Sequence, residues 1–249
     1  MKTIAVRQSI TAANDRLAET LRQRFACHGI LALNLIASPG AGKTALLEET
    51  IASLGQSYTI KVVEGDPYTG LDSQRVVQAG AQSVQINTEG GCHLDARMVE
   101  AAITAFDLGR TDLIVIENVG NLLCPAAWDL GQDATVIVTS LTEGDDKPLK
   151  YPETFARAQA IVINKIDLAP YLPVSIADLK ASALRVNPGL IVFEVSCMNG
   201  TGMGSWHEWV RTQIIRKMAF STHGRGKSAE WEAGCETVNT MTKGSHQSP

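Results

Sequence analysis

Short, continuous apolar runs alternate along the chain with segments whose apolar residues recur every three or four positions. Runs of the first kind are typical of strands that are buried on both faces of a sheet. They lie at 30–38, 58–66, 83–87, 112–118, 134–140, 160–167 and 190–196. Segments of the second kind predict helices, as at 8–28, 44–54 and 95–106. This order of elements predicts an α/β fold with a mostly parallel sheet, right-handed crossovers and helices on both faces.

Length and composition narrow the class of protein. The 249 residues are 45% hydrophobic, which predicts one large domain over 1–220 that includes the N-terminal helix. The segment 221–249 is polar and rich in small residues, and we expect a disordered tail there. A net charge of −4 gives no footprint for nucleic acid, and no apolar run reaches the length of a membrane span. Because the N-terminus lacks the apolar core of a secretory signal, we expect a cytoplasmic protein.

The segment ASPGAGKT, at 37–44, follows the first predicted strand and opens a predicted helix. This order is typical of the phosphate-binding loop (P-loop) of an NTPase fold, in which backbone N–H groups face the phosphates. Lys43 is expected to reach the β- and γ-phosphates and the Thr44 hydroxyl to bind Mg²⁺. Ala37 stands where the motif usually has its first glycine, which indicates a different exit from the strand. The predicted nucleotide-binding residues of the loop are Pro39, Gly40, Ala41, Gly42, Lys43, Thr44 and Ala45.

The segment NKID, at 164–167, ends another apolar run and predicts which base is bound. The Asp167 carboxylate is able to accept hydrogen bonds from N1–H and the exocyclic amine of guanine, whereas adenine has an acceptor at N1. We therefore predict that GTP or GDP is bound by Asn164, Lys165 and Asp167. The later segment SCMNGTG, at 196–202, is similar to the GTPase loop whose backbone N–H contacts the guanine oxygen. Ser196 and Cys197 of this segment are therefore also predicted nucleotide-binding residues, with the Cys197 N–H as donor. Met198 stands where that loop usually has lysine.

Two acidic residues, Asp66 and Glu117, each end a predicted strand downstream of the phosphate-binding loop. Such carboxylates hold Mg²⁺ directly or through water, although either one alone is equally well explained as a solvated loop residue. A backbone N–H near Gly120 is placed to sense the γ-phosphate. The predicted catalytic set is Lys43, Thr44, Asp66 and Glu117, and the last three are the predicted Mg²⁺ ligands. We find no residue placed like the water-orienting glutamine of Ras-type GTPases, so we expect slow hydrolysis unless a partner or second subunit assists.

Cys92 and His93 are adjacent in the segment TEGGCHLD, and Cys124 ends the segment IENVGNLLC. Thiolate and imidazole are ligands that suit Zn²⁺ and Ni²⁺. Adjacency by itself is a weak signal, because Cys27–His28 is a second such pair at the end of a predicted helix, where helix-end packing explains it. Metal binding, reactivity and plain burial all remain open on these residues alone.

The motifs together resemble the HypB GTPases, a family that assists nickel insertion into nickel-iron hydrogenase and is grouped with the urease accessory GTPase UreG. The resemblance covers about residues 10–215 and includes NDRLA, NLIASPGAGKTALLEET, VVEGD, NTEGGCHLDARMV, IENVGNLLCPA, TEGDDKPLKYPETF and INKIDLAPY. It implies that Cys92, His93 and Cys124 bind Ni²⁺ or Zn²⁺ at or near the interface of a GTP-dependent homodimer. It also implies a HypA-type nickel metallochaperone and the hydrogenase large subunit precursor as partners.

The resemblance leaves specific points open. Lys147 or Lys150, in TEGDDKPLKYP, is placed either to contact a nucleotide across the dimer or simply to be solvated. The Cys-x-x-Cys-Gly-Cys site or histidine-rich tract that many members carry is missing before residue 37, which argues against nickel storage. Two alternatives remain: a related GTPase metallochaperone for another metalloenzyme such as urease, and a nucleotide-dependent interaction module with structural zinc.

Overall fold

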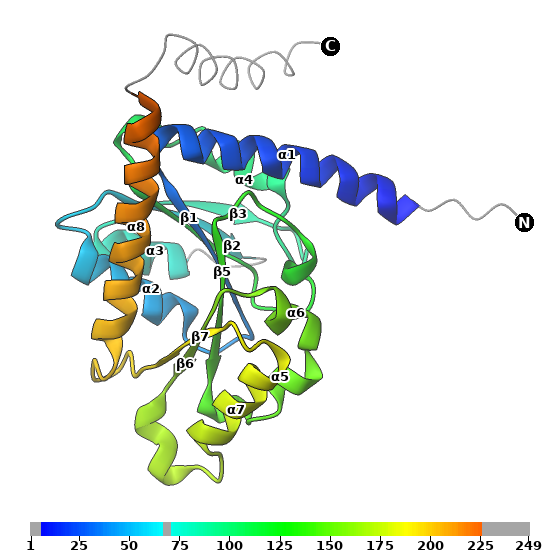
Figure 1. Cartoon of the computed structure of the whole chain (residues 1–249), viewed down its shortest axis with the longest axis vertical. Helices are drawn as coiled ribbons and strands as arrows, with labels where there is room; N and C mark the ends of the chain where they lie inside the picture. Colours follow the sequence, from blue (N-terminus) through cyan, green and yellow to red (C-terminus); the bar gives the residue numbers. More distant parts are fainter. Residues whose placement is uncertain (1–5, 67–70, 226–249) are drawn as a thin grey trace, which may run out of the picture.

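In the described part of the chain, seven strands form one sheet in which every ladder is parallel (Figure 1). The computed structural model describes residues 6–66 and 71–225, with side chains at 11–65 and 73–221. The strands are β1 (Leu31–Ala37), β2 (Ile60–Asp66), β3 (Gln82–Asn87), β4 (Leu113–Glu117), β5 (Ala134–Ser140), β6 (Ala160–Asn164) and β7 (Ile191–Glu194). Their order across the sheet is β3-β2-β4-β1-β5-β6-β7. The predicted fold class is confirmed, and the carboxyl end of β1 lies where the strand order changes direction, which is the usual ligand site of such sheets.

The apolar runs fold as strands because the central strands bury both of their faces. In β1, Leu33 and Leu35 belong to the core on one side of the sheet, whereas Ala32 and Ile36 belong to two clusters on the other side. Burying each leucine or isoleucine contributes about 1.5–3 kcal/mol. Asn34, which is 1% exposed, interrupts the second face between those two clusters. A buried amide at this seam requires hydrogen-bond partners from neighbouring segments.

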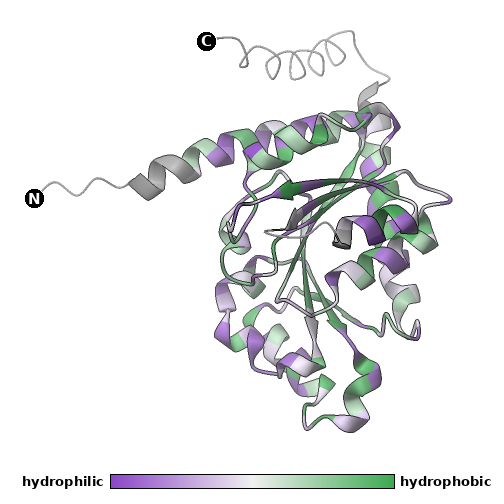
Figure 2. Ribbon diagram, turned by 180° about the vertical axis from the view of Figure 1, so that it is seen from behind, coloured by the Kyte–Doolittle hydropathy of each residue, from purple (hydrophilic) through white to green (hydrophobic). Residues whose placement is uncertain are grey.

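Helices cover both faces of the sheet (Figure 1). On one face lie α2 (Lys43–Leu54), α3 (Leu71–Ala79) and α8 (Met203–Arg225). On the other lie α1 (Val6–His28), α4 (Ala96–Ile103), α6 (Pro152–Arg157) and α7 (Ile176–Val186). Figure 2 shows strands that are largely hydrophobic, with polar stretches on some of them, between helices striped with polar residues. Short elements complete the fold: α5 (Lys147–Lys150), η1 (Leu108–Arg110), η2 (Pro125–Ala127), η3 (Leu141–Glu143) and η4 (Ile166–Tyr171).

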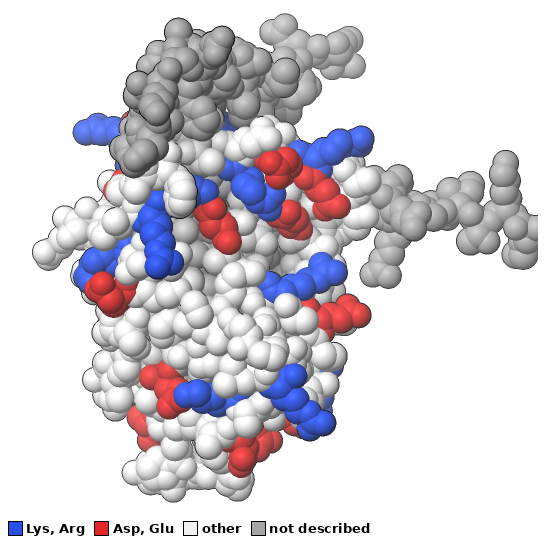
Figure 3. All heavy atoms as spheres, viewed as in Figure 1, with Lys and Arg blue, Asp and Glu red and all other residues white. Residues whose placement is uncertain are grey.

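Three further sequence predictions concern the C-terminal tail, a membrane span and the surface charge. α8 continues to Arg225, into the segment predicted as a tail, and the rest of that segment, 226–249, lies outside the described residues. No helix in the described ranges combines the length and apolar character that a membrane span requires. Figure 3 shows basic and acidic side chains intermingled on one face of the molecule, with no extended patch of either sign.

Candidate nucleotide and metal site

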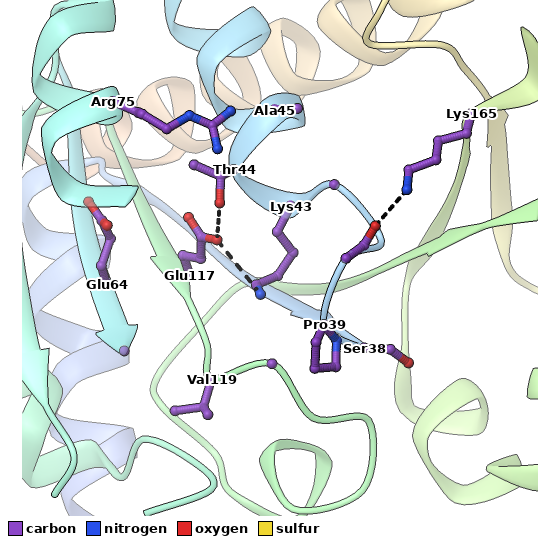
Figure 4. Close-up of a pocket in the computed structure, with 14 residues that line it drawn as sticks. Ser38, Pro39, Lys43, Thr44, Ala45, Glu64, Arg75, Glu117, Val119 and Lys165 are labelled. Atoms are coloured by element: carbon purple, nitrogen blue, oxygen red, sulfur yellow. Dashed lines mark hydrogen bonds and ion pairs between the residues drawn. The ribbon is translucent and has the colours of Figure 1, made fainter. Parts of the chain in front are cut away.

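The loop between β1 and α2 lines a cavity of about 560 Å³ (Figure 4). Gly40 and Gly42 have φ angles of 80° and 98°, where a side chain would be strained. A Cβ at Gly42 would also lie 2.4 Å from Nδ2 of Asn164. Because Gly42 is the N-cap of α2 and makes no side-chain cap, no side chain at that position covers the first amides of the helix. This cradle of main-chain N–H groups fits a phosphate group.

Three of the predicted catalytic residues meet in this cavity. Thr44 Oγ1 donates to Glu117 Oε1 at 2.9 Å, and Lys43 Nζ lies 3.7 Å from the same oxygen (Figure 4). Glu117 ends β4, which pairs directly with β1, so the sheet itself brings this acid beside the phosphate-binding loop. The hydroxyl and carboxylate oxygens are the hard ligands that Mg²⁺ prefers, and their approach fits that ion. Asp66 ends β2, but its side chain lies outside the described residues, and its role stays a prediction.

Sequence reasoning missed two charged residues that line the cavity, Glu64 and Arg75. Glu64 is 3% exposed and accepts a hydrogen bond from Ser83 Oγ. Its signal was an acid in an apolar run, two residues before Asp66 and therefore on the same face of the strand. Arg75, on α3, donates from Nε and Nη2 to the carboxylate of Glu48 on α2, at 2.9 and 2.6 Å. Nothing local in the sequence marks Arg75, because only the packing of α2 against α3 brings it to the cavity.

Asn164 joins the phosphate-binding loop to the predicted base-reading segment. Its Nδ2 donates to the carbonyl of Ala41 at 3.1 Å. Its Oδ1 accepts from the N–H groups of Lys165 and Cys197 at 2.7 and 3.2 Å. Lys165, in the left-handed region with φ 61°, donates from Nζ to the carbonyl of Gly40 at 2.8 Å. The two loops are therefore joined by one buried and one exposed hydrogen bond, neither of which needs a ligand.

Asp167 has the property that a guanine-reading residue requires. Its Oδ1 is buried and, among the described residues, has no hydrogen-bond partner. An unsatisfied buried acceptor costs about 1–3 kcal/mol, which a ligand edge carrying N–H donors would relieve. The Cys197 N–H, predicted to face the guanine oxygen, is instead engaged by Asn164 in this structure. Burial also raises the pKa of the Cys197 thiol to about 11, while Ser196 is fully buried.

The structure brings Cys92, His93 and Cys124 together from two separate segments. Cys92 Sγ lies 3.6 Å from His93 Nδ1, and a hydrogen bond with the Cys92 thiol raises the pKa of Cys124. Asn121 Nδ2 lies 3.7 Å from Cys124 Sγ. The His93 ring stacks on Trp128, with centroids 4.5 Å apart, and burial lowers the pKa of this histidine. Burial thus favours the neutral imidazole, the form that binds metals.

These three side chains are neighbours rather than a finished coordination sphere. Within the described ranges, no group of three or more His, Cys, Asp or Glu side chains is arranged to hold a metal ion. That finding includes Cys27 and His28, which are the last two residues of α1. A metal at Cys92, His93 and Cys124 would therefore need movement of one segment, or ligands from elsewhere.

The two lysines of the segment at 147–150 have different surroundings. Lys147 Nζ donates to Ser38 Oγ, in the phosphate-binding loop, at 3.3 Å. Lys150 pairs with Asp146 at 2.6 Å, on the surface. Of the two, Lys147 is the one beside the nucleotide cavity, and it reaches the loop from within the same chain.

The family model of the CobW/HypB/UreG nucleotide-binding domain matches residues 31–194. Hydrogenase maturation factor HypB of Azotobacter vinelandii is 46% identical over 212 residues, which are 85% of this chain and 70% of that protein. The chain belongs to the HypB family. The HypB of Escherichia coli K12 is 45% identical over 85% of this chain and 73% of its own length.

Solved structures extend the comparison with the HypB family. HypB of Archaeoglobus fulgidus matches with a TM-score of 0.77 and 38% identity, over 82% of this chain and 99% of that one. HypB of Helicobacter pylori, in a crystal structure described as a complex with nickel, matches with a TM-score of 0.78 and 32% identity. The match covers 83% of this chain and 97% of that one. A signal recognition particle protein from Aeropyrum pernix, 14% identical with a TM-score of 0.52, shares the fold alone. The P-loop NTPase fold is thereby confirmed.

Proposed function

We propose that this chain is a GTP-hydrolysing metallochaperone that carries nickel and assists its insertion during nickel-iron hydrogenase maturation. One observation carries the proposal: a single segment, 117–128, begins at Glu117 in the nucleotide cavity and reaches the predicted metal residues. Cys124 of this segment lies beside Cys92, and the two form the thiol pair; Trp128 stacks on His93. A protein with this connection has a physical route by which nucleotide state changes metal affinity. The names of its HypB relatives support hydrogenase as the destination.

The choice of GTP rests on Asp167, whose buried Oδ1 suits the N–H donors of guanine. Lys43 holds the β- and γ-phosphates, and Thr44 and Glu117 hold Mg²⁺ with Asp66 as the further predicted ligand. Bound there, Mg²⁺ supplies positive charge that offsets the charge of the transferring phosphoryl group. Since no water-orienting glutamine is evident in the sequence, hydrolysis is slow without a second subunit or a partner.

The incomplete metal group supports a homodimer that forms with GTP. One chain provides two thiols and an imidazole that lie beside one another without, in the described residues, an arrangement that holds a metal ion. A second copy, related by a two-fold axis, brings an equal set, so two half-sites complete the coordination of Ni²⁺ or Zn²⁺. Lys147, already at the phosphate-binding loop, is the better placed of the two lysines to act near the nucleotide.

A HypA-type nickel metallochaperone and the hydrogenase large subunit precursor are the proposed partners, and the cytoplasm is the proposed compartment. A second destination has a specific observation in its favour. The relative from Helicobacter hepaticus, 38% identical over 78% of this chain, is named a hydrogenase/urease maturation factor. Co-purification of this chain with hydrogenase or urease precursor distinguishes the two destinations.

The test is a titration of the purified protein with Ni²⁺ and Zn²⁺, in GDP and in a non-hydrolysable GTP analogue. We expect nickel binding that depends on the nucleotide and that is lost in Cys92→Ala and Cys124→Ala. Cys197→Ala is the matched control, because it removes another thiol outside this group and keeps the backbone N–H that is the predicted guanine contact. GTP turnover is measured in parallel, with Lys43→Ala expected to lower it about 10²–10³-fold. Nickel binding unchanged in both cysteine variants contradicts the metal role, and unchanged turnover in Lys43→Ala contradicts the GTPase role.

A further inference from the structure

Asn118 contacts three segments that meet between the nucleotide cavity and the thiol pair. It follows Glu117 directly and is 0% exposed. Its Oδ1 accepts hydrogen bonds from the N–H groups of Val119 at 3.0 Å and Leu94 at 3.1 Å. Its Nδ2 donates to Oδ1 of Asn34, on β1, at 3.2 Å. Two backbone donors on one oxygen fix the orientation of the amide, so this side chain holds a single position between the three segments.

On the nucleotide side, the next two residues after Asn118 form part of the cavity wall. Both Val119, labelled in Figure 4, and Gly120 line the cavity. Gly120 lies against the phosphate-binding loop, since a Cβ there would be 3.2 Å from Cγ of Pro39. A γ-phosphate that accepts a hydrogen bond from a main-chain N–H of this wall therefore binds next to the hydrogen bond from the Val119 N–H to Asn118 Oδ1.

On the metal side, Leu94 directly follows Cys92 and His93, and its N–H is the donor to Asn118. The Leu94 side chain is fully buried against β2, where a Cβ on Gly65 would lie 2.8 Å from Leu94 Cγ. Gly65 also lines the nucleotide cavity. The Cys92–His93 pair is thus attached to the cavity wall at two points, one polar and one apolar.

We propose that Asn118 is the positioning residue that makes the metal affinity of the Cys92–His93 pair depend on the bound nucleotide. This rests on the proposed function. If the Val119 N–H turns away, the buried Oδ1 of Asn118 loses one of its two donors, and the amide moves to find another. The Leu94 N–H is also buried and has no water to bond with, so it follows Asn118 Oδ1. Coupling of this kind is reciprocal, so metal at the pair changes nucleotide affinity by the same factor.

Asn14, on α1, provides a matched control. It is 8% exposed, its Oδ1 accepts from the Ala96 N–H at 2.9 Å, and its Nδ2 donates to the Asp129 carbonyl at 2.8 Å. It therefore anchors the same two segments, just beyond the metal residues, through an equal number of hydrogen bonds to main chain, one buried and one half-buried. Neither of its partners lines the nucleotide cavity. Asn14→Ala loosens the two segments without cutting their connection to the nucleotide.

The experiment measures the nickel Kd of the full chain in GDP and in a non-hydrolysable GTP analogue, and takes the ratio. Typical couplings between sites change affinity about 5–150-fold. We expect a ratio in that range for wild type and for Asn14→Ala, and a ratio within about twofold of unity for Asn118→Ala. A ratio in Asn118→Ala equal to that of wild type overturns the proposal.

Hydrogen exchange at the Leu94 amide separates this inference from the proposed function, because it requires neither metal nor turnover. In wild type, exchange of this amide should differ between the GDP and GTP-analogue states, and the difference should vanish in Asn118→Leu, which leaves no cavity. If no nickel binds in either state but this difference is present and Asn118-dependent, the metal role fails and the link stands. If the Leu94 amide of wild type exchanges at the same rate in both nucleotide states, the proposed role of Asn118 is overturned, even if nickel binds.

Discussion

The indole ring of Trp128 stacks on the imidazole of His93, with the ring centroids 4.5 Å and the planes 16° apart. Trp128 comes four residues after Cys124, so both predicted metal segments meet at this stack. Because a ring at this distance senses any ion bound by the imidazole, we predict that Ni²⁺ quenches Trp128 fluorescence. Trp128→Phe should abolish the quenching and weaken nickel binding by only about 2–10-fold, the value of one aromatic contact.

The other tryptophans supply the control for this measurement. Trp206→Phe leaves the stack intact and should retain the quenching, since Trp206 lies on α8 in the core of the opposite face. Quenching that persists in Trp128→Phe would show that the ion binds away from His93.

Asp167→Asn should change which base is bound. The amide presents an N–H where the carboxylate presented only acceptors, so it opposes the exocyclic amine of guanine and suits the carbonyl that xanthine has in its place. We predict a loss of GDP affinity of about 10²-fold and a gain for xanthosine diphosphate, measured by calorimetry. Asp178→Asn, on α7, removes another carboxylate and should leave both affinities unchanged. Equal GDP binding in wild type and Asp167→Asn would exclude Asp167 from base recognition.

Cys197 should react slowly with alkylating reagents. Burial raises the pKa of its thiol from 9.0 to about 11, so the thiolate fraction at pH 8 is about 10²-fold below that of a free cysteine. We predict that alkylation, followed by peptide mass spectrometry, accelerates until about pH 11. Since the folded pKa lies above the unfolded one, the stability that burial of the neutral thiol provides is present below pH 9 and is lost as pH rises from about 9 to about 11. A titration midpoint near 9 in the native protein contradicts this picture.

Trp206 should be a principal anchor of α8. It is 2% exposed, donates from Nε1 to Thr50 Oγ1 at 2.8 Å, and packs edge-on against Phe193. Trp206→Ala should lower the free energy of unfolding by about 3–5 kcal/mol, measured by urea denaturation. Trp209, which is only partly buried, makes ring contacts in the same cluster and provides the comparison: its alanine variant should lose distinctly less. Equal losses of unfolding free energy in the two variants would show that the deeper burial of Trp206 does not make it the stronger anchor.

Much of the fold was readable from the sequence because its signals are local. The apolar runs became the seven strands with shifts of a few residues at their ends, and α1, α2 and α4 formed where the apolar spacing predicted them. The helix α8 extends past residue 220 to Arg225, and Ser221 is only 4% exposed, which composition alone did not reveal. Ser221 lies against Gly29, a contact between distant segments that no local pattern predicts.

The candidate site divides along the same physical line. The phosphate-binding loop, with Lys43 and Thr44, was determined by the sequence alone, because glycine conformation and helix start act over a few residues. The tertiary structure alone decided that Arg75 reaches the cavity, that Asn164 engages the Cys197 N–H, and that Asn118 holds Leu94. Each of those contacts joins residues far apart in the chain, and strand order, which no local pattern encodes, sets which of them meet.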